Sequence, residues 1–336
     1  MKLMARFINF IWYTDQFIPV WLSPFSLVFI DVVRFRRFLY RKGLLRIKKL
    51  PVPVIIVGNI TVGGTGKTPL CIWLAGFLKQ QGYRPGIISR GYGGRTRQWP
   101  QRVSPDSDPL QVGDEALLLA RHTECPVVAG PKRVKAAQML LQNTDCNVIL
   151  SDDGLQHYAL GRDIEVAVID GKRRLGNSYC LPAGPLREPV QRLKEVDLII
   201  CNGATEEANE FSMHYQCGAL NNMFSGEQID LQQLTGTACH AIAGIGNPQN
   251  FFDLLQQAGL ECETHPFPDH YEFQADDLKF DDNKPLLMTE KDAVKCMKFA
   301  TKLCWYLSIQ CQPEQPFATR LLELLAEKIP QKPEQN

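Results

Sequence analysis

The stretch 61–68 reads TVGGTGKT and has the residue types and spacing of a phosphate-binding loop. In such loops backbone N–H groups surround the phosphates, a lysine reaches the β- and γ-phosphates, and the next hydroxyl binds Mg²⁺. Lys67 and Thr68 occupy these two positions. The strict pattern has a glycine where this chain has Thr61, which fits only if Thr61 has ordinary backbone angles. A glycine-rich turn without a ligand is the alternative. The predicted nucleotide-binding residues are Thr61, Val62, Gly63, Gly64, Thr65, Gly66, Lys67 and Thr68.

Two adjacent carboxylates, Asp152 and Asp153, follow the apolar run 148–150 and Ser151. Like charges side by side at the end of a strand repel each other, and a bound cation removes that cost. Phosphoryl-transfer sites hold Mg²⁺ with such an acidic residue beside the phosphate-binding loop. We therefore predict that Asp152, Asp153 and Thr68 bind Mg²⁺. A solvated corner between strand and loop is the alternative.

Alternating strands and helices must position these residues. The β-branched run 52–57 precedes the loop, and apolar residues at helical spacing follow it. The same alternation continues with expected strands at 86–89, 126–129, 148–150, 164–169 and 197–201 and expected helices at 114–121 and 133–141. Such a pattern predicts an α/β fold like that of P-loop NTPases, with a mostly parallel sheet and helices on both faces.

The chain divides into three predicted parts. Residues 51–220 form the P-loop core, and residues 221–336 form a smaller second α/β domain. The second domain is expected to hold strands at 241–243 and 286–288, each followed by a helix. Residues 1–50 differ in composition from both and form an N-terminal segment.

The N-terminal segment combines aromatic and basic residues. Its longest uncharged run, 16–30, contains two prolines and is shorter than the roughly 20 apolar residues of a membrane-spanning helix. A basic cluster at 34–49 follows, interleaved with apolar residues. This pattern favours an amphipathic segment in a membrane interface, with the cations on anionic headgroups. A helix pair packed on the core, with a solvated basic face, is the alternative. The net charge of +1 gives no support to nucleic acid as a partner.

The cysteine pattern indicates no special chemistry. The chain has 11 cysteines, none in a C-x-x-C pair. We therefore expect neither a zinc site nor a disulfide framework, and reduced thiols in a cytosolic compartment.

Several motifs together resemble one family, tetraacyldisaccharide 4'-kinase, the lipid A kinase of Gram-negative bacteria. The matching stretches are GNITVGGTGKTP (58–69), SRGYGG (89–94), VGDE (112–115), AGPKR (129–133), SDDGLQH (151–157), LPAGPLREP (181–189), FPDHYEF (267–273) and TEKDAVKC (289–296). The resemblance implies that ATP phosphorylates the 4'-hydroxyl of tetraacyldisaccharide 1-phosphate, giving lipid IVA. It implies a peripheral or monotopic location on the cytoplasmic face of the inner membrane, with no obligate protein partner.

The resemblance also implies roles for single residues. Asp114 is the expected base, His270 its partner, and Lys67 contacts the transferred phosphate. Asp114 as a helix N-cap and His270 as an ordinary surface or core residue are the alternatives. The expected substrate-binding residues are Arg90, Tyr92, Arg133 and Arg187, each arginine being equally suited to a structural ion pair. Glu188 is expected in the Mg²⁺ shell, with Gln156 and His157 supporting it. No role is assigned to 290–292.

Three other function classes are compared with these residues. A membrane-associated GTPase or metallochaperone would need an N-K-x-D motif, and the closest string, TEKD at 289–292, lacks its amide side chain. Dimeric switch ATPases have a lysine where this chain has Val62. A membrane-docked ATP sensor would need no base such as Asp114.

Overall fold

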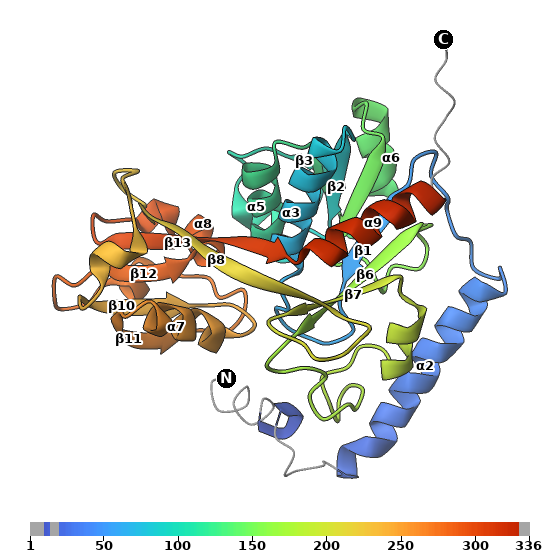
Figure 1. The fold of residues 1–336 in the computed structure, drawn as a ribbon, viewed down its shortest axis with the longest axis horizontal. Helices are drawn as coiled ribbons and strands as arrows, with labels where there is room; N and C mark the ends of the chain where they lie inside the picture. Colours follow the sequence, from blue (N-terminus) through green and yellow to red (C-terminus); the bar gives the residue numbers. More distant parts are fainter. Residues whose placement is uncertain (1–9, 14–19, 329–336) are drawn as a thin grey trace.

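The computed structural model describes residues 10–13 and 20–328. Thirteen strands of these residues form one continuous sheet in the order β11-β10-β12-β13-β8-β7-β6-β1-β5-β2-β4-β3, with β9 paired to β8 (Figure 1). The strands are β1 (Val54–Gly58), β2 (Pro85–Ser89), β3 (Gln101–Val103), β4 (Val127–Ala129), β5 (Val148–Asp152), β6 (Ile164–Asp170), β7 (Leu198–Asn202), β8 (Phe211–Asn222), β9 (Gln228–Ile229), β10 (Ala238–Ala243), β11 (Glu261–Pro266), β12 (Leu286–Thr289) and β13 (Cys304–Pro313).

Helices cover both faces of this sheet. The α-helices are α2 (Ser23–Arg41), α3 (Lys67–Gln80), α4 (Pro109–Val112), α5 (Asp114–Thr123), α6 (Arg133–Asn143), α7 (Pro248–Gln257), α8 (Glu290–Cys296) and α9 (Gln315–Lys328). Short 3-10 turns occur at Val20–Leu22, Val190–Glu195, Leu231–Leu234, Ala275–Leu278 and Met297–Phe299.

The P-loop core is built on a parallel block of strands. From β7 through β6, β1, β5 and β2 to β4 every neighbouring pair is parallel, and only β3 at the edge is antiparallel. Apolar residues of α3, α5 and α9 form a core on one face, and those of α6 form a core on the other. Parallel strands buried on both faces need apolar cover on each side, and the helices provide it. The predicted α/β fold is therefore confirmed.

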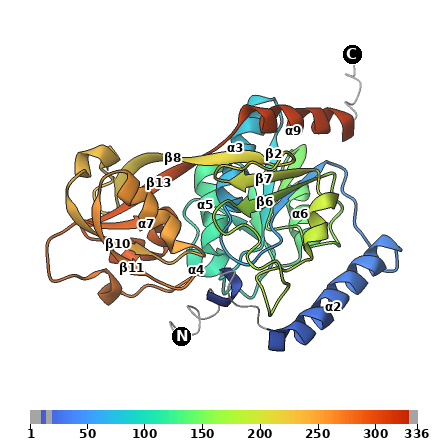
Figure 2. The same cartoon turned by 60° about the horizontal axis from the view of Figure 1, so that its bottom comes forward.

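A long antiparallel pair, β8 and β13, connects this core to the second region (Figure 2). The second region adds β10, β11 and β12 as parallel strands, with α7 and α8 packed on them. The chain then returns along β13, and α9 buries Phe317 and Leu321 in the first core. A division at residue 220 therefore falls within β8 and separates α9 from the core on which it packs.

The structure corrects one prediction about the cysteines. Cys239 and Cys262 form a disulfide, although reduced thiols were expected throughout. The two residues are direct partners in the register of β10 and β11. Their separation of 23 residues gave no sign of this, because only the pairing of the two strands brings them together.

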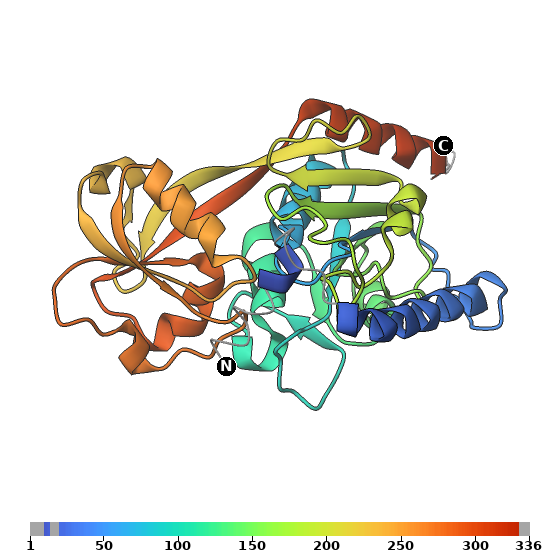
Figure 3. The ribbon, with the colours of Figure 1, turned by 90° about the horizontal axis from the view of Figure 1, so that it is seen from below.

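The N-terminal helix α2 lies along the outside of the core (Figure 3). Its partly buried Phe29 and Ile30 pack on the core face that also holds α6. Within the described residues, no helix combines the length and the apolar character needed to cross a bilayer. Residues 1–9 and 14–19, part of the predicted interface segment, lie outside the described residues.

Candidate active site

The phosphate-binding loop connects β1 to α3, as the sequence predicts. Lys67 is the first residue of α3, and Gly63 and Gly66 have φ angles of 106° and 99°, which favour glycine. Thr61 is not among the residues with positive φ and lies in an isolated bridge with Leu186. An ordinary residue is therefore tolerated where the strict pattern has glycine.

Asn202 and Tyr215, which no sequence motif indicated, also support this loop. Asn202 of β7 donates a hydrogen bond from Nδ2 to the Thr65 carbonyl at 3.3 Å, and another to the Tyr215 hydroxyl at 3.0 Å. A Cβ at Gly66 would lie 2.4 Å from that hydroxyl, so the loop packs directly against Tyr215. Neither residue lies in a recognisable motif, and only the neighbouring positions of β7 and β8 bring them here.

The two carboxylates at the end of β5 lie beside the loop. Thr68 Oγ1 lies 3.3 Å from Asp152 Oδ2, and Lys67 Nζ lies 3.6 Å from Asp153 Oδ1. Burial raises the pKa of Asp152 to about 7, and the nearby Glu115 carboxylate adds to the rise. Burial acts the same way on Asp153, but Lys67 and three arginines outweigh it and lower the pKa of Asp153 to about 2. The surroundings therefore shift the pKa values of these two neighbours in opposite directions.

Arg133 supports this corner from inside the protein. Arg133 is 2% exposed, and its guanidinium donates to the backbone carbonyls of Gly130, Asp152 and Asp153. Burial lowers the pKa of Arg133 to about 10. A side chain so enclosed holds the end of β5 in place. The prediction that it binds substrate finds no support in this geometry.

The side chains of the neighbours Arg187 and Glu188 contact different parts of the protein. Arg187 Nη1 lies 3.3 Å from Asp153 Oδ1, on the side of the phosphate-binding loop. Glu188 is 1% exposed and accepts hydrogen bonds from Gln156 at 2.8 Å and from Tyr158. The Glu188 carboxylate also forms ion pairs with two arginines. Its Oε2 atom lies 3.9 Å from Arg37 Nε and 3.5 Å from Arg192 Nε. Both oxygens of the Glu188 carboxylate therefore already have protein partners. The expected role of Glu188 in the Mg²⁺ shell stays a prediction, and this geometry does not favour it.

Asp114 and His270 meet across the two regions of the molecule. Asp114 begins α5 and is 5% exposed, while His270 lies in the segment after β11 with a φ of 57°. Their Oδ2 and Nδ1 atoms are 3.2 Å apart. Burial would raise the pKa of Asp114, but Lys291 and His270 lower it to about 2. The carboxylate is therefore ionised at neutral pH, and it is not the helix N-cap, which is Gly113.

Tyr92 and Arg90 border the same pair. The Tyr92 ring is 50% exposed and its centroid lies 4.5 Å from that of His270. The Arg90 guanidinium lies 5.7 Å from the centre of the Tyr92 ring. Both residues are exposed to solvent, and their contact with the acceptor stays a prediction.

Lys291 is a site residue to which the sequence gave no role. Its Nζ lies 3.1 Å from Glu115 of α5 and 3.3 Å from Asp269, the neighbour of His270. These carboxylates and Asp114 raise the pKa of Lys291 against the effect of its burial. One cation therefore links the acidic start of α5 to the segment that carries His270. The TEKD string was the available signal, but it did not show which carboxylates the lysine would meet.

The second region also contacts the phosphate-binding loop directly. A Cβ at Gly246 would lie 2.3 Å from the Gly64 backbone nitrogen. Arg173 donates to the Gly246 carbonyl at 2.7 Å, and Asn247 donates to Asp170 at 3.3 Å. The loop after β10 therefore lies on the phosphate-binding loop, and glycine is required at this close approach.

Comparisons with known proteins identify the family to which the chain belongs. A family model described as tetraacyldisaccharide-1-P 4'-kinase matches residues 18–326. The tetraacyldisaccharide 4'-kinase of Nitrosococcus oceani is 53% identical over 321 residues, which make up 96% of this chain and 95% of that protein. The protein of the same name from Coxiella burnetii is 48% identical over 308 residues, 92% of this chain and 91% of that protein.

A solved structure is also similar. It is described as the "apo" form of LpxK from Aquifex aeolicus in complex with ATP, and it is 31% identical in sequence. The match covers 90% of this chain and 98% of that chain, with a TM-score of 0.75.

Proposed function

This chain belongs to the family of tetraacyldisaccharide-1-P 4'-kinases, and we propose that Asp114 and His270 act in it as one catalytic pair. The enzyme is a tetraacyldisaccharide 4'-kinase, a phosphotransferase that uses ATP and an alcohol acceptor in lipid A biosynthesis. The metallochaperone or switch alternative is not favoured. The observation that carries the assignment of the pair is the 3.2 Å contact between its side chains, which joins the P-loop core to the second region.

The pair fits the removal of a proton from an attacking hydroxyl. A base must be unprotonated at the working pH, and Asp114 is. A carboxylate with a pKa near 2 holds a proton weakly, so it needs a neighbour that shares the proton. His270 lies within hydrogen-bond reach and can accept it. Asp114 thus accepts the proton of the acceptor hydroxyl as its oxygen bonds to the γ-phosphorus and ADP leaves, and the imidazole becomes positive when it takes up that proton.

Lys67 and the backbone of residues 61–68 are proposed to bind the ATP phosphates. The Thr65 hydroxyl is buried without a hydrogen-bond partner, which suits a group that a ligand completes. Arg187 reaches the same side of the loop and is proposed to contact phosphate. Arg90 and Tyr92 are proposed to contact the lipid acceptor.

Thr68, Asp152 and Asp153 fit a bound Mg²⁺ by their chemistry, because a hydroxyl and two carboxylates offer the oxygen ligands that this ion prefers. The burial that raises the pKa of Asp152 is a second sign, since a cation would offset that cost. When bound, Mg²⁺ neutralises the charge on the β- and γ-phosphates.

Helix α2 is proposed to bind the membrane surface on which the lipid acceptor lies. Phe25, Val28, Val32 and Phe35 follow each other at helical spacing and are 61–64% exposed. Arg34 and Arg36 of the same helix precede and follow Phe35 in the sequence. An exposed apolar stripe flanked by cations suits peripheral binding to an anionic leaflet. We place the enzyme on the cytoplasmic face of the inner membrane.

Transfer of ³²P from γ-labelled ATP to tetraacyldisaccharide 1-phosphate in detergent micelles tests the pair. The intact enzyme is compared with Asp114→Ala and the isosteric Asp114→Asn. We expect both variants to lose on the order of 10²–10⁴ in turnover, the range for a general base. Equal transfer by all three proteins would reduce Asp114 to a structural residue. Label appearing only as free phosphate would contradict the kinase assignment.

A further inference from the structure

A cluster of metal-ligating side chains lies in the second region, away from the phosphate-binding loop. His240 is on β10, and Glu263 and His265 are on the neighbouring edge strand β11. His240 pairs with Glu263 in the parallel register, and His265 is two residues further along. Side chains two residues apart on a strand point to the same face, so all three project from one face of the sheet.

The spacing of the three donor groups is close to that of a metal site. His240 Nδ1 lies 3.2 Å from His265 Nε2 and 3.7 Å from Glu263 Oε2. His265 Nε2 lies 3.9 Å from Glu263 Oε1. Two imidazole nitrogens bound to one tetrahedral Zn²⁺ at about 2.05 Å are roughly 3.3 Å apart. The histidine pair already has this separation, and a small rotation of the exposed Glu263 would complete the set.

A second carboxylate orients the buried histidine. Asp282 Oδ1 lies 3.1 Å from His240 Nε2. The His240 ring is also stacked on Phe280, with the ring centres 3.8 Å apart. A proton on Nε2, directed at Asp282, leaves the lone pair of His240 Nδ1 pointing at the cluster. Metal-binding histidines characteristically donate their other nitrogen to a carboxylate in this way.

We propose that His240, His265 and Glu263 bind a divalent transition-metal ion of the Zn²⁺ type, with Asp282 as the positioning residue. Two imidazoles and one carboxylate select such ions over Mg²⁺ and Ca²⁺, which prefer oxygen ligands only. His240 is 4% exposed and Glu263 is 65% exposed in its side chain. The ion would thus enter from the solvent side and keep a position for water.

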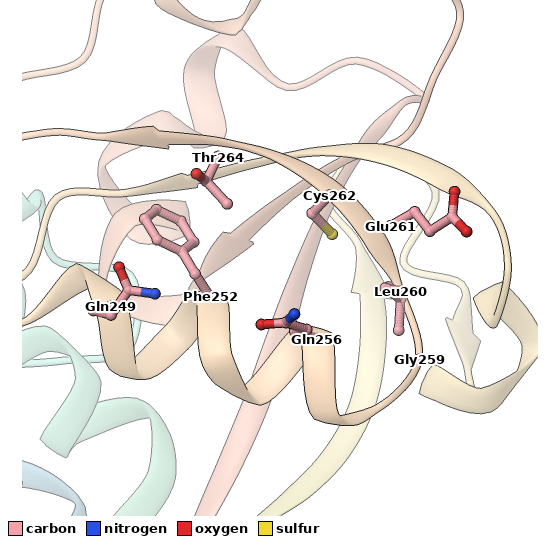
Figure 4. A pocket seen from close by; sticks show the side chains of 8 residues that line it. All are labelled: Gln249, Phe252, Gln256, Gly259, Leu260, Glu261, Cys262 and Thr264. Carbon is pink, nitrogen blue, oxygen red and sulfur yellow. The ribbon is translucent and has the colours of Figure 1, made fainter.

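The site would stabilise the part of the second region that carries His270. It would tie β10 to the edge strand β11 and, through Asp282, to the loop after Phe280. Figure 4 shows the other side of the same edge strand, where Cys262 and Thr264 line a cavity facing α7. The segment with His270 begins directly after β11. The disulfide would fix β11 on one face of the sheet and the ion would fix it on the other.

Metal binding to the full chain tests this proposal. The protein is treated with EDTA, dialysed, and titrated with Zn²⁺ by calorimetry and with Co²⁺ by visible absorption. No reductant is added, so that Cys239 and Cys262 stay paired as the disulfide and cannot serve as ligands. We expect one ion per chain at this site, and excess Mg²⁺ should not displace it.

Matched variants locate the ion. His265→Ala and Glu263→Gln, whose side chains are more exposed than His240, should bind Zn²⁺ at least about 10-fold more weakly, and Asp282→Asn about 10–100-fold more weakly. His214→Ala removes an exposed histidine of β8 and should leave binding unchanged. Absence of binding, or binding that His265→Ala and Glu263→Gln leave intact, would overturn the proposal and leave a hydrogen-bonded histidine pair.

Discussion

His270 Nδ1 lies 3.2 Å from Asp114 Oδ2, although 156 positions separate the two residues in the sequence. One residue begins a helix of the P-loop core, and the other follows the edge strand of the second region. The contact therefore exists only while the two regions are together. A site assembled in this way can exclude water and limit ATP hydrolysis without an acceptor.

Replacing His270 tests whether the pair acts on turnover. We expect His270→Ala to lower kcat by about 10²–10⁴ while the KM for ATP changes little, because the imidazole acts on the acceptor proton. Steady-state ³²P transfer at varied ATP concentrations measures both. His270→Asn is a control for backbone strain. His270 has a positive φ, and asparagine tolerates this conformation, so the variant removes the imidazole without straining the backbone. Equal losses in kcat and ATP affinity would argue for a structural role.

Lys291 should stabilise the contact between the two regions. Lys291→Met removes a largely buried cation from Glu115 and Asp269, and we expect it to lower the free energy of unfolding by about 1–3 kcal/mol. Lys279→Met is the control, because its ion pair with Asp276 lies on the surface and should contribute less than about 0.5 kcal/mol. Denaturant unfolding gives both values, and equal effects would contradict the assignment.

Gly246 should be required for the close approach to the phosphate-binding loop. We expect Gly246→Ala to raise the KM for ATP several-fold, because its Cβ would collide with the Gly64 nitrogen and displace one of the two loops. Gly76→Ala in α3 is the control, since a Cβ there meets nothing within 4 Å. That control should be neutral or stabilise by up to about 1 kcal/mol. Unchanged ATP kinetics in Gly246→Ala would show that the contact is dispensable.

The lowered pKa of Asp114 predicts a specific acid sensitivity. Lys291 and Lys295 from α8 and His270 from the segment after β11 face this carboxylate and favour its ionised form. With a folded pKa of about 2 and an unfolded pKa of about 3.9, its stabilisation is complete above about pH 5 and is lost as pH falls towards 2.

Asp114→Asn lacks this ionisation. The difference in unfolding free energy between the intact enzyme and Asp114→Asn, on the order of 2 kcal/mol from this source, should therefore shrink between about pH 5 and pH 2. Denaturant unfolding at several pH values measures it. A difference that stays constant with pH would show that the carboxylate is not held by these cations.

The exposed stripe of α2 should determine membrane binding. We expect the double substitution Val32→Glu and Phe35→Glu to reduce sedimentation with vesicles of phosphatidylglycerol and phosphatidylethanolamine by at least about 10-fold, through lost apolar burial and added repulsion. Phe224→Glu is the control, because this residue is equally exposed, at 62%, but lies in the second region. An equal loss in both variants would contradict the assignment to α2.

The sequence alone determined the local parts of this enzyme. The β1–loop–α3 unit, the acidic end of β5 and the start of α5 at Asp114 were all predictable, because a buried strand, a glycine-rich turn and an amphipathic helix are encoded by neighbouring residues. The family motifs added His270, whose position in an irregular segment carries no periodic signal of its own.

Only the tertiary structure decided which distant residues share the site. The link from Lys291 to Glu115, the contact of Gly246 with Gly64 and the support from Asn202 and Tyr215 all join residues far apart in the chain. The burial of Arg133 and the packing of α9 on the first core also depend on contacts between residues far apart in the chain. Such contacts depend on strand order and on the long pair β8 and β13, whereas periodicity and spacing report only on residues within one element or its nearest turn.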